Sequence, residues 1–189
     1  MKRAWHIGLP GWTIQDGNYD DFAIGDLAKF AVEFYFPKNP ATSKHTQIKI
    51  VHNAWAHYQV SAPVAAMGMN AWVLDLGILA FSERKPPRGV RNGTQLQGEV
   101  YLEIDPYFYF EYLHTDTSLP PLIYSWRIRE IWRNLTPRIP KRRFLSRVWV
   151  RDESNIRWEP VDRTDAWNHD DAEYVLVCEL TDYPPARTL

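Results

Sequence analysis

The chain has 189 residues, of which 45% are hydrophobic and 14% aromatic. A chain of this length can bury a substantial core, and its apolar content excludes a disordered protein. The formal net charge of -1 excludes a global positive field that would collect nucleic acid or anionic membranes, so binding to either has to be local.

The cysteine content and the apolar runs indicate a cytoplasmic protein. The single cysteine, Cys178, lies in an apolar run, which excludes an intramolecular disulfide and predicts a buried thiol. Lys2 and Arg3 are not followed by the apolar stretch of a signal peptide. The one stretch of membrane-spanning length, 62–81, is interrupted by Asp75 and by glycine and proline. We interpret it as a loop or short turn that feeds a buried strand.

Short strands separated by turns are predicted along the whole chain. In 29–36 apolar side chains share one face, and in 94–104 they alternate strictly with polar ones, which predicts strands with one buried face. Strands are also predicted for 47–51, 71–81, 107–114, 144–150 and 174–180. The aromatic run 107–114 would present apolar side chains on both faces of its strand, so both faces need cover. We expect core on one side and packing against a second sheet or helix on the other, with a loop, partner subunit or ligand as the alternative.

The stretch 122–135 fits two kinds of secondary structure. Its apolar residues have helical spacing, and Pro120 and Pro121 could open a helix. Leu122, Tyr124 and Trp126 alternate equally well with polar residues, and their neighbours are rich in aromatic and β-branched types. We predict a strand, with a short helix as the alternative.

Turn residues and 14 prolines argue against long helices and predict an all-β fold. The expected architecture is an antiparallel barrel or a two-sheet sandwich, with room for one short helix. We expect a single β-rich domain over 1–189. The proline-rich stretch 83–92 is the candidate for an internal division, and a long hairpin loop is its other interpretation.

Two acidic segments are candidate ligand sites. The first contains oxygen-bearing residues that could converge on a hard cation, but an EF-hand loop would need Gly and Glu where Asp21 and Leu27 stand. The second combines an imidazole, an indole and carboxylates ahead of the strand at 174–180. The alternative for both is a solvated turn. The candidate ligand-binding residues are Asp16, Asn18, Tyr19, Asp20, Asp21, Trp167, His169 and Asp170.

A basic segment at 127–147 is the candidate for binding single-stranded nucleic acid. Its cations are interleaved with Trp126, Trp132 and Phe144, as in proteins that combine a basic groove with stacking platforms. The alternative is a solvated face whose tryptophans belong to the core. The candidate residues are Arg138, Lys141, Arg142 and Arg143.

Sequence motifs assign no catalytic residue. The chain has no nucleophile elbow of the G-x-S-x-G type, no phosphate-binding P-loop and no G-x-G-x-x-G fingerprint. We therefore predict a small binding or interaction module without a metal or another cofactor. A protein partner, self-association or a small ligand is expected ahead of nucleic acid, and no membrane is expected. A small metal-dependent or carboxylate-based enzyme is the alternative, if the two acidic segments meet in space.

Overall fold

The computed structural model describes residues 3–44, 46–143, 146–169 and 171–188, and its secondary structure is 49% strand and 8% helix. The strands are β1 Ala4–Pro10, β2 Leu27–Phe30, β3 Val32–Tyr35, β4 Ala41–Thr42, β5 Lys49–Ala54, β6 His57–Met67, β7 Trp72–Asp75, β8 Leu79–Ser82, β9 Gln95–Ile104, β10 Tyr124–Asn134, β11 Arg138–Arg143, β12 Ser146–Arg151, β13 Trp158–Val161 and β14 Glu173–Leu180. The helical segments are α1 Trp12–Gln15, α2 Phe108–Glu111 and the 3₁₀ turns η1 Leu113–Thr115 and η2 Ala166–Asn168.

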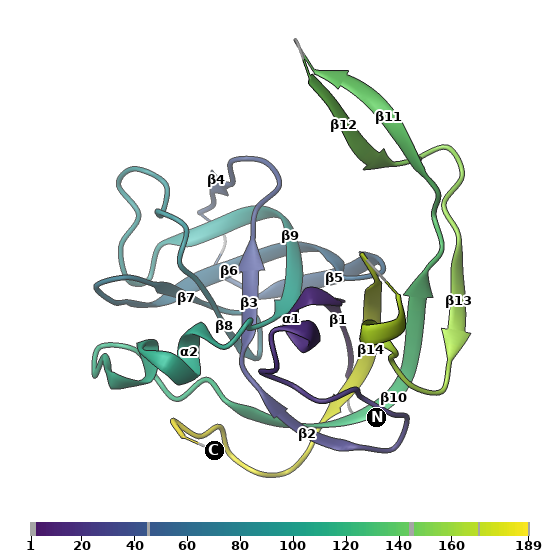
Figure 1. The fold of residues 1–189 in the computed structure, drawn as a ribbon. Helices are drawn as coiled ribbons and strands as arrows, with labels where there is room; N and C mark the ends of the chain where they lie inside the picture. Colours follow the sequence, from purple (N-terminus) through teal and green to yellow (C-terminus); the bar gives the residue numbers. More distant parts are fainter. Residues whose placement is uncertain (1–2, 45, 144–145, 170, 189) are drawn as a thin grey trace.

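Five strands close into a barrel in the order β3, β9, β6, β7 and β8, and β8 returns to β3 (Figure 1). The predicted all-β barrel is therefore confirmed. Its sheet is mixed rather than purely antiparallel, because β3 and β8 run parallel. The chain forms four further strands between β3 and β8, and β8 then runs in the same direction as β3.

The remaining strands of the large sheet extend outside the barrel. β1 pairs along its whole length with β14, so segments near the two ends of the sequence lie side by side (Figure 1). β14 continues to β10, which also carries β13 and β2. A parallel contact between Gly8 on β1 and Glu103 on β9 joins this extension to the barrel.

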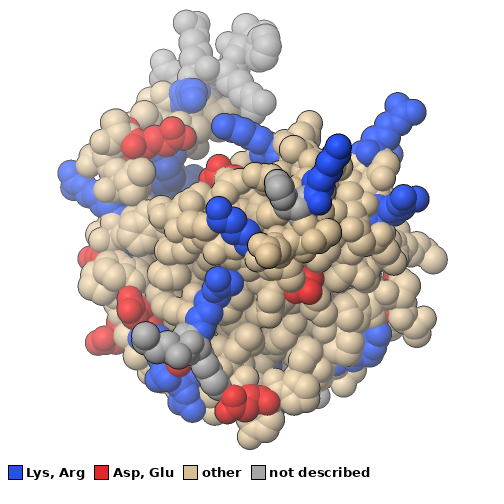
Figure 2. All heavy atoms as spheres, turned by 180° about the vertical axis from the view of Figure 1, so that it is seen from behind, with Lys and Arg blue, Asp and Glu red and all other residues tan. Residues whose placement is uncertain are grey.

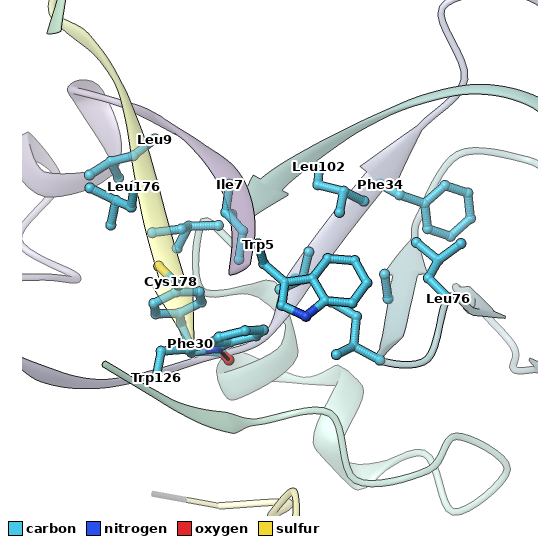
Figure 3. Packing of buried hydrophobic residues seen from close by; sticks show 14 of the residues in the cluster. Trp5, Ile7, Leu9, Phe30, Phe34, Leu76, Leu102, Trp126, Leu176 and Cys178 are labelled. Carbon is cyan, nitrogen blue, oxygen red and sulfur yellow. Dashed lines mark hydrogen bonds between the residues drawn. The ribbon is translucent and has the colours of Figure 1, made fainter. Parts of the chain in front are cut away.

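Aromatic side chains fill the core where the barrel meets its extension. Phe30 stacks on Trp126 with ring centroids 5.4 Å apart, and the Trp126 indole N–H donates to the carbonyl of Phe30 over 3.2 Å (Figure 3). Cys178 lies in the same cluster and is fully buried, as predicted, and burial raises the pKa of its thiol. The cluster spans both parts of the fold, since Trp5 and Phe34 also belong to it.

Several predicted strands are confirmed because their alternating side chains enter this core. In β9, Val100, Leu102 and Ile104 are fully buried. The stretch 122–135 forms a strand, β10, rather than a helix, and Trp126 and Ile128 point into the core. The two short α-helices lie elsewhere in the chain.

Two predicted elements differ from the structure. The aromatic run 107–114 forms α2 and η1 rather than a strand, because the buried carboxylate of Asp105 accepts the amides of Phe108 and Tyr109 over 2.8 and 3.0 Å and so begins a helix. The hypothesis of an aromatic strand covered on both faces is therefore wrong. The predicted strand 71–81 is split into β7 and β8 by a turn at Gly77, whose φ of +80° suits glycine.

The stretch 62–81 consists largely of barrel strands, since β6 extends to Met67 and β7 and β8 follow. No helix in the described part of the chain is long and apolar enough to span a membrane. Residues 83–92 connect β8 to β9, which both belong to the barrel. This connection is not a hairpin loop, because β8 and β9 lie on opposite sides of β3.

Candidate functional site

A two-stranded ribbon projects from the body of the molecule (Figure 1). It consists of β11 and β12, residues 138–143 and 146–151, and is called the arm below. The strands are antiparallel, with Arg138 opposite Arg151 at the root and Arg142 opposite Arg147 further out. Among the described residues, none from the arm belongs to a buried core cluster. Because an isolated hairpin is marginally stable in water, the arm depends on what it contacts.

Positive charge is concentrated in the arm. The arm carries six of the 22 Lys and Arg residues and none of the 23 Asp and Glu residues. The rest of the chain therefore has 16 basic and 23 acidic residues, a formal charge of -7. The near-neutral total thus conceals a strongly basic projection on an acidic body. On the face opposite to that of Figure 1, many Lys and Arg side chains lie in the upper half of the molecule, both beside the arm and away from it (Figure 2).

The arm also exposes apolar side chains. Ile139 and Val148 are 43% and 40% exposed, and Trp149 is 61% exposed. Lys141, which the sequence singled out, is exposed on the same ribbon. Arg142 and Arg143 are the last two residues of β11. The arm thus combines cations with apolar contact surface.

An ion-pair network fixes the root of the arm to β14. Arg151 lies 3.5 Å from the carboxylate of Glu173, and Asn134 donates to the same carboxylate over 2.9 Å. Arg151 also donates to the carbonyls of Thr136 and Asp171 over 2.8 and 3.0 Å. Arg138 lies 3.4 Å from the Asp171 carboxylate and 3.8 Å from that of Glu173. Charge-assisted hydrogen bonds are typically about 2.7 to 2.9 Å long, so Arg138 is held loosely.

A hollow of about 410 Å³ lies at this root and is called the root hollow below. Its charged lining comprises Arg133, Arg138, Arg151, His169 and Asp171. Arg133 donates to Glu159 through Nε over 2.8 Å and through Nη2, and its Nη1 donates to Nε2 of His169. The hollow thus brings together Arg138 and His169, which the sequence assigned to two different candidate sites.

Two exposed tryptophans lie on the segments next to the root hollow in the chain or in hydrogen-bond contact with its lining. Trp12 on α1 is 47% exposed and Trp167 on η2 is 63% exposed. The two elements pack together, since Gln15 donates to the carbonyl of Ala166 over 2.7 Å. The amide of Gly11, next to Trp12, donates to the carbonyl of Ala172 over 2.6 Å, and Ala172 lines the hollow.

The two acidic segments meet in space, as the enzyme alternative requires. Their contact is a set of bonds to Asp21, whose carboxylate accepts the hydroxyl of Thr164 over 2.6 Å and the amide of Ala166 over 3.2 Å. Asp16 and Asp20 are exposed. Of the second segment, His169 lines the root hollow, Trp167 is exposed, and Asp170 lies outside the described residues. The meeting point therefore joins two loops through hydrogen bonds.

The other two residues of the first segment bind the backbone. Tyr19 donates its hydroxyl to the carbonyl of Asp105 over 2.9 Å, and Asn18 donates to the carbonyl of Pro106 over 3.4 Å. Both bonds hold the corner that precedes α2. Within the described residues, no group of three or more His, Cys, Asp or Glu side chains is arranged to hold a metal ion.

A second cluster of titratable groups was missed by sequence reasoning. Glu33 on β3 and Glu103 on β9 lie directly opposite each other, and both are half-buried. Burial raises the pKa of each carboxyl to about 7, and the charge of Glu103 further raises that of Glu33. Burial also raises the pKa of Asp105 to about 8. The alternation in 94–104 identified Glu103 as polar but carried no sign of its burial.

Comparison with protein-family models, with curated proteins and with solved structures finds no match for this chain.

Proposed function

We propose that the protein is a nucleic-acid-binding module whose arm provides the main contact. The observation that carries the proposal is the separation of charge, with six cations and no acid on a projecting ribbon and a formal charge of -7 on the rest. The sequence favoured a protein partner, self-association or a small ligand over nucleic acid because the charges cancel in the total. A polyanion at the arm is attracted by a local field that this total does not reveal.

The contacts of the arginines indicate which part of the basic segment is available. On β10, Arg129 is paired with Glu179 over 2.6 Å, and Arg133 is bound by Glu159. These cations are already neutralised by partners on the body. The arm from Lys141 outward carries no acidic residue on either strand. The phosphate contacts are therefore assigned to the outer arm, with exposed Trp149 and Val148 as apolar contacts.

The test is the salt dependence of oligonucleotide binding, measured by fluorescence anisotropy with labelled 20-mers. We expect affinity to fall steeply with salt. The triple variant K141Q/R142Q/R143Q should reduce the slope of log K against log salt by about 2 to 3, since each lost phosphate contact removes about 0.7 to 0.9. A matched variant, K29Q/K85Q/R88Q, removes three cations from β2 and from the loop between β8 and β9. It should leave the slope nearly unchanged.

Two results would contradict the proposal. One is the absence of binding at low salt, and the other is an equal effect of the two triple variants, which would reflect total charge rather than the arm.

Self-association is the second candidate function. It is supported by the open edges of β11 and β12, which among the described strands pair only with each other, and by exposed Ile139. Light scattering measures the oligomeric state. A wild-type dimer that the substitution I139D disrupts would support self-association through the arm.

A further inference from the structure

Three strongly exposed tryptophans lie on segments that supply or contact the lining of the root hollow. Trp12, Trp149 and Trp167 are 47%, 61% and 63% exposed. Each lies close in the chain to a residue that contacts or lines the hollow. Trp149 precedes Arg151 by two residues and so shares its face of the strand, and Trp167 precedes His169 by two. Trp12 follows Gly11, which is bonded to Ala172.

The fold itself gives these three indoles no aromatic partner among the described residues, although other tryptophans of the chain do stack. Trp55, for example, lies on Trp158 with ring centroids 4.3 Å apart. Strongly exposed indoles on neighbouring segments favour a binding role over a packing role. The surface that these rings offer suits a flat, aromatic ligand.

The root hollow offers a loosely held cation for an anion. Among the described residues Arg138 is held by the pairs at 3.4 and 3.8 Å, whereas Arg151 is held by Glu173 at 3.5 Å and by the carbonyls of Thr136 and Asp171 at 2.8 and 3.0 Å. A phosphate oxygen can form shorter, bidentate hydrogen bonds with a guanidinium than these carboxylates do. A ligand that combines phosphates with aromatic rings therefore matches both parts of the site.

We infer that the ligand of the arm root is single-stranded nucleic acid, with a backbone phosphate held by Arg138 and with neighbouring bases stacked on Trp12 and Trp167. This inference rests on the proposed function and specifies its substrate class. In a duplex the faces of the bases are covered by adjacent base pairs, so exposed indoles find nothing to stack on. An unpaired strand presents those faces, and stacking on aromatic side chains accepts any base sequence.

The experiment compares a labelled single-stranded 12-mer of thymidine with a labelled duplex of the same length. For the wild-type protein we expect at least tenfold tighter binding of the single strand and quenching of tryptophan fluorescence. W12A and W167A should each weaken single-strand binding by about tenfold without changing the salt slope, because they remove stacking and leave the phosphate contacts in place. W167F keeps an aromatic face and should restore most of the affinity.

Y183A is the matched control, since Tyr183 is 71% exposed and lies on the C-terminal tail. It should bind the single strand like the wild type. Equal or tighter binding of the duplex, with no effect of W12A and W167A, would overturn the single-strand inference and leave the proposed function standing. Failure to bind either oligonucleotide at low salt would overturn both. A melting curve of each variant confirms that it is folded.

Discussion

At the scale of single residues, the facing carboxyls of Glu33 and Glu103 make stability depend on pH. The pKa of each is about 7 in the folded protein, above the ordinary 4.5, so the folded state keeps protons that the unfolded state releases. The stability that these two carboxyls contribute is fully present at a pH below their ordinary pKa, and it falls as pH rises from about 4.5 to 7. The variant E33Q removes one member of the pair. We expect it to raise the melting temperature at about pH 8 and to flatten the decline between about pH 5 and pH 8.

The measurement is a series of melting curves for the wild type and E33Q, with E153Q as the control because Glu153 is exposed. The difference between the two curves reports on Glu33 and on the groups that its charge affects, among them Asp105. Asp105, with a raised pKa, contributes a decline in the same direction to both proteins, and His6, whose pKa burial lowers, contributes an opposite change. If the melting temperatures of the wild type and E33Q change with pH in parallel, the pH dependence does not come from the burial of these two carboxyls.

Residue patterns in the sequence predicted which side chains enter the core and which carry charge, but not how charges are placed. The buried faces of 94–104 and 174–180 follow from local alternation, which needs no knowledge of other segments. The burial of Glu103 depends on β3 and β1, which lie far away in the sequence. The neutral total charge concealed the basic arm for the same reason, because the charges cancel in sequence and separate in space.

At the scale of elements, Glu173 joins the arm to the body. Its carboxylate faces Arg138, Arg151 and Asn134, so E173Q should loosen the arm. Partly exposed ion pairs contribute roughly 1 kcal/mol or less, which corresponds to about fivefold faster amide hydrogen exchange in β11 and β12. Mass spectrometry measures this exchange. E179Q on the same strand is the control, because Glu179 pairs with Arg129 on β10 and not with the arm. Unchanged exchange in E173Q would mean that the network does not hold the arm.

The predictions of secondary structure were correct where the side-chain pattern within a segment decides its structure. They were wrong where one contact with another residue decides it. The aromatic run 107–114 has strand composition, yet the Asp105 carboxylate begins a helix there. β1 was not predicted because Gly8 and Pro10 interrupt its apolar pattern, although pairing with β14 makes it a central strand. The basic segment was recognised as a candidate site. The sequence did not show that Arg129 and Arg133 on β10 are paired with the body while the arm projects from it (Figure 1), because their partners Glu179 and Glu159 come later in the chain.

At the scale of the whole molecule, the arm is separable from the folded body. The backbone amide of Asp152 donates to the carbonyl of Pro137 over 2.8 Å, so the two ends of the arm already lie together. A variant in which Gly-Gly replaces residues 138–151 should close this gap without strain. Because the described arm residues contribute nothing to either core cluster, we expect cooperative unfolding with a melting temperature within about 4 °C of the wild type.

The same deletion tests the division of charge between arm and body. Without the arm the protein retains 16 basic and 23 acidic residues, so it should repel oligonucleotides that the wild type binds at low salt. Calorimetry and anisotropy on one preparation give both results together. Loss of cooperative unfolding would show that the arm stabilises the body. Full retention of binding by a folded deletion variant would place the nucleic-acid contact on the barrel and its extension, and it would contradict an arm that acts as the contact.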